Sequence, residues 1–270
     1  MTSPKRPSHL YKYQPLCAQS LSNLKDRTLW FSAPAHFNDP YDCANDVVPD
    51  QLPEAEFVRL YEMMRKDAND GIRFDAKYQS GGKPNDLFRT ETMNSIRSNF
   101  DARRRLHLHQ RGVACLSEHV DHLLMWAHYA DGHRGFCLEF DAANDPFNRA
   151  REVTYHERPA LVNPVDVLDD AKEDDLDRNL IGSMLLAKSD HWAYEREWRL
   201  LHMKADHAYG YHFASLTGIY FGAAMPETHI EILAMILKGS PTKLYRMQHN
   251  PRDFSLTPIP VTYTPFNFTA

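Results

Sequence analysis

Two glutamates separated by one residue, Glu195 and Glu197, are the side chains best suited to chemistry in this chain. They stand at the start of a strand-like run over residues 198–203. Residues i and i+2 of an extended segment share a face, so we expect both carboxylates to point into one cleft. Two carboxylates at one cleft can divide the work of charge stabilisation and general base catalysis.

The segment that leads to these glutamates carries charge where its own pattern demands apolar residues. Apolar residues recur before it at helical spacing, at Leu176, Leu180, Ile181, Met184 and Leu185. A helix continued through Lys188 places Lys188, Trp192 and Glu195 on the same stripe. Charged groups carried into a core are either paired or functional. One interpretation is therefore catalytic, and the other is an ion-pair cluster of Glu195 or Glu197 with Arg196, Arg199 or Lys188 that closes a sheet edge.

The strands and helices expected from the sequence indicate a single α+β domain over residues 1–270. Its central sheet is expected to be mixed and mostly antiparallel. Strands at 10–13 and 29–32 flank a helix at 17–25, which gives a β-α-β opening. Residues 53–109 are mostly helical and are interrupted by a Gly-rich loop at 81–84, so we expect a helical insertion there. Alternating elements follow, with strands at 112–117, 135–140, 152–156, 198–203, 218–221, 243–248 and 255–261 and helices at 121–129, through 188 and at 226–237.

Composition excludes several classes of protein. A content of 43% hydrophobic and 25% charged residues is that of a soluble globular protein, and no run approaches the roughly 20 apolar residues of a membrane span. The polar start of the chain predicts a cytoplasmic protein without a signal peptide or a membrane partner. The net charge of -5 gives no general attraction to nucleic acid. Gly-x-Gly-x-x-Gly, Gly-Lys-[Ser/Thr] and Gly-x-Ser-x-Gly motifs are missing, and the His and Cys spacings match no recognised zinc site, so no metal is expected.

Six blocks of the chain carry a resemblance to a known family. They are Leu10-Tyr-Lys-Tyr13, Leu29-Trp-Phe-Ser-Ala-Pro34, Phe37-Asn-Asp-Pro-Tyr-Asp42, Leu124-Met-Trp-Ala-His-Tyr-Ala130, His133-Arg-Gly-Phe-Cys-Leu-Glu-Phe140 and Glu195-Arg-Glu-Trp-Arg199. In order and spacing, from residue 10 to about residue 221, these blocks resemble the motif series of a bacterial family of unassigned function, domain of unknown function family 2971. This resemblance implies a family without implying a reaction.

More distantly, the order of residue types looks like the mono-ADP-ribosyltransferase superfamily. An aromatic first strand, a hydroxyl that ends the second strand and a late Glu-x-Glu carry the resemblance. It implies a split sheet and NAD as the substrate. Glu197 would hold the 2-hydroxyl of the nicotinamide ribose, while Tyr11, Lys12 or Tyr13 together with Ser32 would hold the nicotinamide and the ribose. The first strand departs from that pattern because it offers neither His nor Arg.

The chemistry that this resemblance implies needs a carboxylate at a fixed place. Cleavage of the glycosidic bond of NAD passes through an oxocarbenium-like state, which an ionised Glu197 would stabilise. Glu195 would then act as general base toward the acceptor, an unknown protein or nucleic acid, in a toxin or phage-defence role. Lys188 or Arg199 would contact the pyrophosphate.

Four further residues have a structural and a functional interpretation. Trp126 and Tyr129 are either core aromatics or a stacking platform for a base or nicotinamide, on a helix for which Asp121 is the expected N-cap. His128 is either a hydrogen-bonded core residue or a proton shuttle. Asn38, within Asn38-Asp39-Pro40, either forms an Asx-type turn or belongs to a loop that covers a ligand next to Ser32.

Two other classes of function remain open from the sequence. The first is a noncatalytic sensor in which Tyr11, Tyr13 and Trp126 hold a nucleotide or a nucleic-acid end. The second is a metal-dependent nuclease or hydrolase that uses Asp39, Asp42 and the Glu195/Glu197 pair. It requires carboxylates from both ends of the chain to meet. From its position between strand blocks, we expect the helical insertion to gate or select the acceptor.

Overall fold

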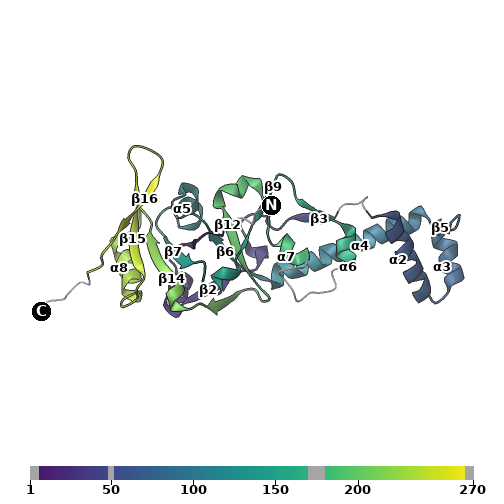
Figure 1. The fold of residues 1–270 in the computed structure, drawn as a ribbon, viewed down its shortest axis with the longest axis horizontal. Helices are drawn as coiled ribbons and strands as arrows, with labels where there is room; N and C mark the ends of the chain where they lie inside the picture. The colour runs from purple at the N-terminus through teal and green to yellow at the C-terminus, as the bar shows by residue number, and fades with distance from the viewer. Residues whose placement is uncertain (1–5, 48–51, 170–179, 265–270) are drawn as a thin grey trace.

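The computed structural model describes residues 6–47, 52–169 and 180–264 (Figure 1). Neighbouring strands of its main sheet are antiparallel except for one parallel pair, β14 with β15. This confirms the predicted α+β class and the mixed, mostly antiparallel sheet. The eight strands that form it in the described residues are, in order across the sheet, β16 (Leu256–Pro260), β15 (Lys243–His249), β14 (Leu216–Phe221), β7 (Phe136–Asp141), β1 (His9–Gln14), β6 (Gly112–Ser117), β12 (Glu197–His202) and β8 (Arg151–Glu152).

Apolar side chains cover the sheet on both faces. In β7, Phe136, Leu138 and Phe140 belong to one core cluster, and Cys137 belongs to a second cluster because successive residues of a strand point to opposite faces. Helices α1 (Ala18–Asp26) and α8 (Glu227–Ile236) supply leucines to the first cluster. Helix α5 (Leu123–Tyr129) supplies Trp126 to the second, so α5 packs on the opposite face.

Short elements connect and extend this framework. Two pairs are antiparallel, β2 (Thr28–Phe31) with β13 (His207–Gly210) and β4 (Gln79–Ser80) with β5 (Lys83–Pro84). Two pairs are parallel, β3 (Asn45–Val47) with β10 (Ala160–Val162) and β9 (Thr154–His156) with β11 (Ala187–Ser189). Short helical elements also connect the strands. They are η1 (Pro34–His36), η2 (Phe147–Arg149), η3 (Asp190–Glu195), η4 (Phe213–Ser215), α6 (Pro164–Asp169) and α7 (Leu180–Met184).

The expected β-α-β order of the opening is confirmed, but its two strands do not pair with each other. The strands β1 and β2 lie on either side of α1 in sequence, but β2 pairs with β13 in a separate two-stranded ladder. Both edges of β1 are occupied by β6 and β7, which leaves no place for β2 beside it.

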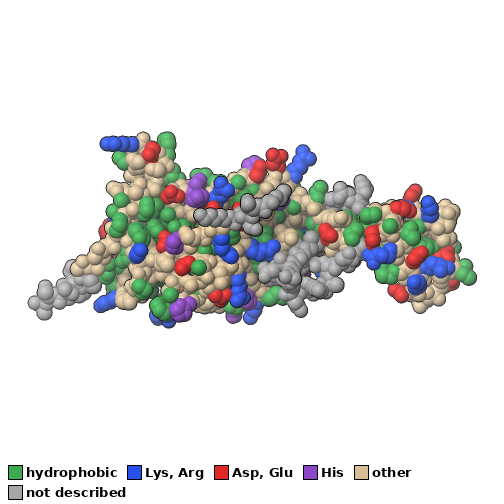
Figure 2. Space-filling view, in the orientation of Figure 1, with side chains coloured by type: hydrophobic (Ala, Val, Ile, Leu, Met, Phe, Trp, Pro, Cys, Tyr) green, Lys and Arg blue, Asp and Glu red, His purple; other side chains and the backbone are tan. Residues whose placement is uncertain are grey.

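Helices occupy the predicted insertion and extend to one end of the molecule (Figure 1). They are α2 (Glu54–Asp67), α3 (Gly71–Tyr78) and α4 (Asp86–Gln110), and α4 leads back to β6. Ring contacts among Tyr61, Phe74 and Phe88 join the three helices. Acidic, basic and apolar side chains are intermixed on the visible surface of this end (Figure 2). No helix in the described part of the chain is long and apolar enough to cross a membrane.

The predicted long helix through Lys188 is also wrong. The helix α7 ends at Met184, and the chain then forms β11 and the 3-10 helix η3. Lys188 therefore lies on a strand, where pairing of β11 with β9 satisfies the backbone, while Trp192 and Glu195 lie on η3. Leu176, the first residue of the proposed stripe, lies outside the described residues. The helix α5 likewise begins later than expected, with His122 rather than Asp121 at its N-cap.

The chain approaches itself closely at Gly135, immediately before β7. A Cβ atom at this position would lie 2.2 Å from Gln14 O and 2.9 Å from Ala130 O. We expect Gly135→Ala to lower the free energy of unfolding by about 1–3 kcal/mol, because backbone atoms must shift to admit the methyl group. Urea unfolding followed by circular dichroism measures this change.

The matched control is Gly71→Ala at the first residue of α3, where nothing lies within 4 Å of the added Cβ. We expect it to change the free energy of unfolding by less than about 1 kcal/mol. Equal unfolding midpoints for the two variants would contradict the close approach at Gly135.

Candidate functional site

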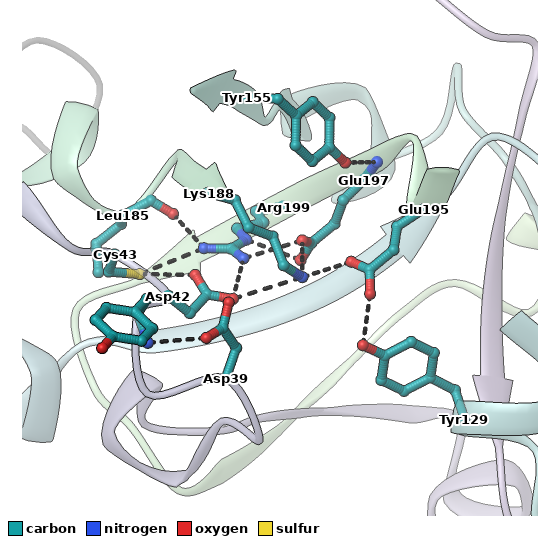
Figure 3. A network of polar contacts seen from close by, with 11 residues as sticks. Asp39, Asp42, Cys43, Tyr129, Tyr155, Leu185, Lys188, Glu195, Glu197 and Arg199 are labelled. Carbon is teal, nitrogen blue, oxygen red and sulfur yellow. Dashed lines mark hydrogen bonds and ion pairs between the residues drawn. The ribbon is translucent and has the colours of Figure 1, made fainter. Parts of the chain in front are cut away.

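A buried network of ion pairs joins Lys188 and Arg199 to Asp42, Glu195 and Glu197 (Figure 3). Lys188 Nζ lies 3.0 Å from Glu197 Oε2 and 3.5 Å from Asp42 Oδ2, and it also donates to Glu195 Oε2. All five side chains are 5% exposed or less. The charged residues that interrupt the apolar stripe are therefore paired, as the ion-pair interpretation predicts, although Lys188 and Arg199 rather than Arg196 supply the cations.

Arg199 binds two of the carboxylates through its planar guanidinium group. Its Nε donates to Glu197 Oε1 at 2.8 Å, and its Nη2 donates to Glu197 Oε2 at 2.9 Å and to Asp42 Oδ2 at 2.8 Å. The remaining nitrogen, Nη1, donates to Leu185 O at 2.8 Å. Such two-point contacts fix both distance and orientation, which a lysine at this position would not do.

The two glutamates reach Lys188 by a route that the sequence did not indicate. Glu195 is the last residue of η3, and Arg196 has a left-handed backbone with φ 44°, so the segment is not extended as expected. Glu197 begins β12, and its backbone N–H donates to Tyr155 Oη at 2.8 Å. The left-handed backbone at Arg196 turns the chain between the two glutamates, and both carboxylates contact the ammonium group of Lys188.

The pKa values of the two glutamates in the network are shifted in opposite directions. Burial raises the pKa of Glu197, but Arg199 and Lys188 outweigh burial and lower that pKa to about 2. Burial raises the pKa of Glu195 above its ordinary value, and Lys188 and a hydrogen bond from Tyr129 offset only part of the rise. When all are ionised, three carboxylates face two cations, which leaves one excess negative charge.

A small cavity of about 140 Å³ lies beside this network, bordered by β1 and β6. These two strands pair only at Tyr11 and Ser117, whereas β1 pairs with β7 along six positions. Lys12 Nζ donates to Cys115 O at 3.2 Å where the strands separate. The lining comprises eight residues of the predicted site, Tyr11, Lys12, Tyr13, Asn38, Tyr129, Lys188, Glu195 and Glu197, together with Phe37, Asp42, Cys115, Leu116, Ser117 and Met125.

Hydrogen bonds hold the aromatic rings of the cavity in place. Tyr11 Oη donates to Glu139 Oε2 at 3.2 Å, and Tyr13 Oη donates to His119 O at 2.7 Å. Tyr129 Oη donates to Glu195 Oε1 at 2.5 Å and so links the aromatic wall to the ion network. Strand alternation predicts Lys12 on the face opposite Tyr11 and Tyr13, but a cavity between separating strands borders residues of both faces.

Four predicted site residues do not line this cavity. Trp126 is fully buried, and its Nε1 donates to Val120 O at 2.6 Å, so its core interpretation holds. His128 is exposed, which contradicts its interpretation as a core residue. Ser32 forms a β-bridge with Val113 and lies apart from the cavity because β2 is not in the main sheet. Arg199 lies behind Glu197, where it binds carboxylates rather than an exposed pyrophosphate position.

Carboxylates from both ends of the chain do meet at this site. Asp42 rather than Asp39 joins the network, and Arg199 and Lys188 lie between Asp42 and Glu197 (Figure 3). Asp39 Oδ1 accepts from Tyr41 N at 2.9 Å, so Asp39 forms the Asx-type turn. Within residues 6–47, 52–169 and 180–264, no group of three or more His, Cys, Asp or Glu side chains is arranged to hold a metal ion.

The sequence named Asp42 and Arg199 as candidates, but it missed their pairing with each other and the role of Tyr155. Asp42 and Arg199 are 157 positions apart, and no local pattern pairs them. Tyr155, which binds the backbone of Glu197, is an isolated aromatic on the short strand β9. The one feature of the sequence that could have indicated these contacts is that an Arg and a Lys on strands require carboxylate partners once they are buried.

The family model described as "Protein of unknown function (DUF2971)" matches residues 125–200. This match supports the family resemblance over the blocks at 124–130, 133–140 and 195–199, and the blocks before residue 43 lie outside it. It covers Tyr129, Lys188, Glu195 and Glu197 of the cavity and the network. No curated protein and no solved structure matches the chain.

The pKa of Glu197 predicts a dependence of stability on pH. A folded-state value of about 2, below the ordinary 4.5, gives stability that is present above pH 4.5 and is lost as pH falls toward 2. We expect the free energy of unfolding to fall by about 2 kcal/mol more between pH 5 and pH 3 in the wild type than in Glu197→Gln. Urea titrations at both pH values measure this difference.

Glu195 contributes little in this window because its raised pKa affects stability mainly above pH 4.5. The matched control is Glu152→Gln, which changes an exposed carboxylate on β8. It should keep the wild-type pH dependence. If Glu197→Gln loses as much free energy of unfolding between pH 5 and pH 3 as the wild type does, Glu197 is not held ionised by its partners.

Proposed function

We propose that this protein is an ADP-ribosyltransferase-like enzyme that cleaves the nicotinamide-ribose bond of NAD and transfers ADP-ribose to a macromolecular acceptor. The observation that carries the proposal is the small cavity, which brings aromatic side chains of β1 and the buried carboxylate of Glu197 together. The separation of β1 from β6 also agrees with the split sheet that the distant resemblance implies.

The chemistry of the cavity suits a nicotinamide ring. The ring is planar and carries a positive charge in NAD, and the network itself has one excess negative charge. Lys12 borders the same cavity, and burial lowers the pKa of its ammonium group, which favours the neutral form. Tyr11, Tyr13, Phe37 and Tyr129 border the same space, and aromatic faces attract cations. A volume of about 140 Å³ admits one such ring but not a complete dinucleotide.

Glu197 has the properties required of the residue that stabilises the transition state. Cleavage breaks the bond between ribose C1′ and the ring nitrogen, and the bonding electrons leave with neutral nicotinamide while positive charge develops on the ribose. A fixed, ionised carboxylate stabilises that charge without reorganising. Arg199 and Lys188 keep Glu197 ionised and hold it in one orientation, although they also reduce its net field.

Glu195 is suited to accept the proton of the incoming nucleophile. Its pKa is raised by burial, so its basicity is closer to that needed near neutral pH than that of Glu197. Tyr129 and Lys188 each bond one of its oxygens and fix its direction. An acceptor hydroxyl or amine that attacks C1′ would transfer its proton to Glu195.

A noncatalytic nucleotide sensor is the second candidate, favoured by the engagement of Glu197 with Arg199 and Lys188. Such a sensor would bind NAD or another nucleotide through the aromatic wall without breaking a bond. The hydrolase alternative has less support because Lys188 and Arg199 already neutralise Asp42 and Glu197.

We expect Glu197→Gln to lower the rate of nicotinamide release from NAD by at least about 100-fold, because the amide keeps the shape but loses the charge. Chromatography of nicotinamide after incubation of the full chain with NAD measures the rate. Glu152→Gln should retain the wild-type rate, and urea unfolding at pH 7 verifies that both variants fold. A wild-type protein that releases no nicotinamide, or an active Glu197→Gln variant, would contradict the proposal.

We expect Tyr129→Phe to shift the acid limb of the pH profile for transfer to higher pH. The lost hydrogen bond lowers the pKa of Glu195 in the wild type, so its removal raises that pKa further. Rates of ADP-ribose transfer measured from pH 5 to pH 9 test this shift. Tyr11→Phe, which removes a hydroxyl bonded to Glu139, should leave the limb in place. Equal shifts in the two variants would refute the role of Glu195 as base.

A further inference from the structure

A larger cavity of about 440 Å³ shares Lys188 with the small one. Residues 156–160, between β9 and β10, form one side, and residues 187–192 of β11 and η3 form another. Asp39 and Tyr41 from the turn before β3 also border it. The two cavities therefore share Lys188, although their remaining lining residues differ.

An arginine at this cavity that is unpaired among the described residues suits an anionic ligand. Arg158 is exposed and forms no ion pair with any residue that the structure describes. His156 and His191 border the same cavity. Glu157 also borders it, but no ion pair within the described residues joins Glu157 to Arg158. A guanidinium group that is free to form paired hydrogen bonds is the usual protein partner of a phosphate.

Aromatic groups in the same cavity suit a nucleobase. Trp192 is partly exposed, and Lys188 Nζ lies 5.3 Å from the centre of its ring, which favours one orientation of the indole. Tyr41, with 70% of its surface exposed, borders the cavity as well. Bases stack on such rings with little regard to sequence.

One buried acceptor in the lining lacks a donor. Asp39 Oδ2 is buried and has no hydrogen-bond partner, although Oδ1 accepts from Tyr41 N. Buried polar atoms are satisfied in most native structures, so this oxygen suggests a donor outside the protein. The amino group of a base, or a ribose hydroxyl, is such a donor.

We infer that the larger cavity binds a nucleoside phosphate, with the base against Trp192 and the phosphate at Arg158. The inference rests on the proposed function, because it places a second nucleotide unit next to the cavity that would receive nicotinamide. That unit has two sources with the same chemistry, the adenylate half of NAD and a nucleotide of a nucleic-acid acceptor.

Isothermal titration of the full chain with AMP, adenosine and ribose 5-phosphate tests the inference without requiring cleavage. AMP should bind at least tenfold more tightly than adenosine, which lacks the phosphate, and than ribose 5-phosphate, which lacks the base. Arg158→Gln should weaken AMP binding by about tenfold and leave adenosine binding unchanged. Trp192→Ala should weaken both AMP and adenosine by about tenfold.

Matched controls lie outside the cavity. Arg149→Gln changes an exposed arginine that pairs with Asp145, and Phe254→Ala changes an exposed aromatic residue. Both should bind AMP as the wild type does. If Trp192→Ala does not fold, Arg158→Gln and the comparison of AMP with adenosine still decide the matter. Failure of AMP to bind, or equal AMP binding by Arg158→Gln and Arg149→Gln, would overturn the inference.

The two proposals fail separately. Arg158-dependent AMP binding without nicotinamide release would refute the transferase and retain the nucleoside phosphate site. Nicotinamide release without AMP binding would refute the nucleoside phosphate site and retain the transferase. If the site is confirmed, AMP that competes with NAD identifies the adenylate half as occupant, while a short oligonucleotide that binds together with NAD, and loses affinity in Arg158→Gln, identifies the acceptor.

Discussion

The pairing of Lys188 and Arg199 with three carboxylates is the interaction on which the site depends. Removal of such charges from water costs several kcal/mol for each ion, and only close, well-directed contacts offset that cost. The contacts come from segments far apart in the chain: Asp42 precedes β3, Lys188 lies on β11, and Arg199 lies on β12. Each segment is therefore held by a partner that it cannot lose without leaving a buried charge uncompensated. This constraint explains why β11 replaces the helix that the apolar spacing favours.

The same network determines what the adjacent cavity can bind. Arg199 is fully buried and donates hydrogen bonds to Glu197, Asp42 and Leu185. It therefore holds the carboxylates that line the cavity rather than contacting a ligand. Glu197 and Glu195 form part of the lining, one with a lowered pKa and the other with a raised pKa. Two carboxylates of unlike basicity at one cavity are the arrangement from which acid-base roles are assigned in enzymes. The separation of β1 from β6 supplies the space, because a continuous ladder would fill it with backbone hydrogen bonds.

The sequence predicted most strands and helices, since the apolar runs of β7 and β12 and the apolar residues of α8 are properties of neighbouring residues. The distant resemblance and the pattern of charges together named eight residues that border the small cavity. It failed where a distant partner decided the outcome. Lys188 leaves the helical stripe for an ion pair, and Ser32 pairs with Val113 of β6, apart from the cavity, because β6 and β7 occupy both edges of β1. Neither partner is visible in a window of ten residues.

A structural role and a functional role for the Glu-x-Glu segment are not exclusive. A network built only for stability would gain from equal numbers of charges, or from apolar residues of similar volume, because buried ion pairs seldom stabilise more than such replacements. Here three carboxylates face two cations, and Glu195, which shares Lys188 with Glu197 and Asp42, also accepts a hydrogen bond from Tyr129 at the cavity. Lys188 also borders the larger cavity, so the network lies between two spaces of different chemistry. The small cavity is aromatic and contains Glu195 and Glu197, and the larger one is aromatic and contains Arg158, which is unpaired within the part of the chain that the structure describes. An excess negative charge retained at this wall is costly for folding alone, and a cationic ring in the small cavity would offset it.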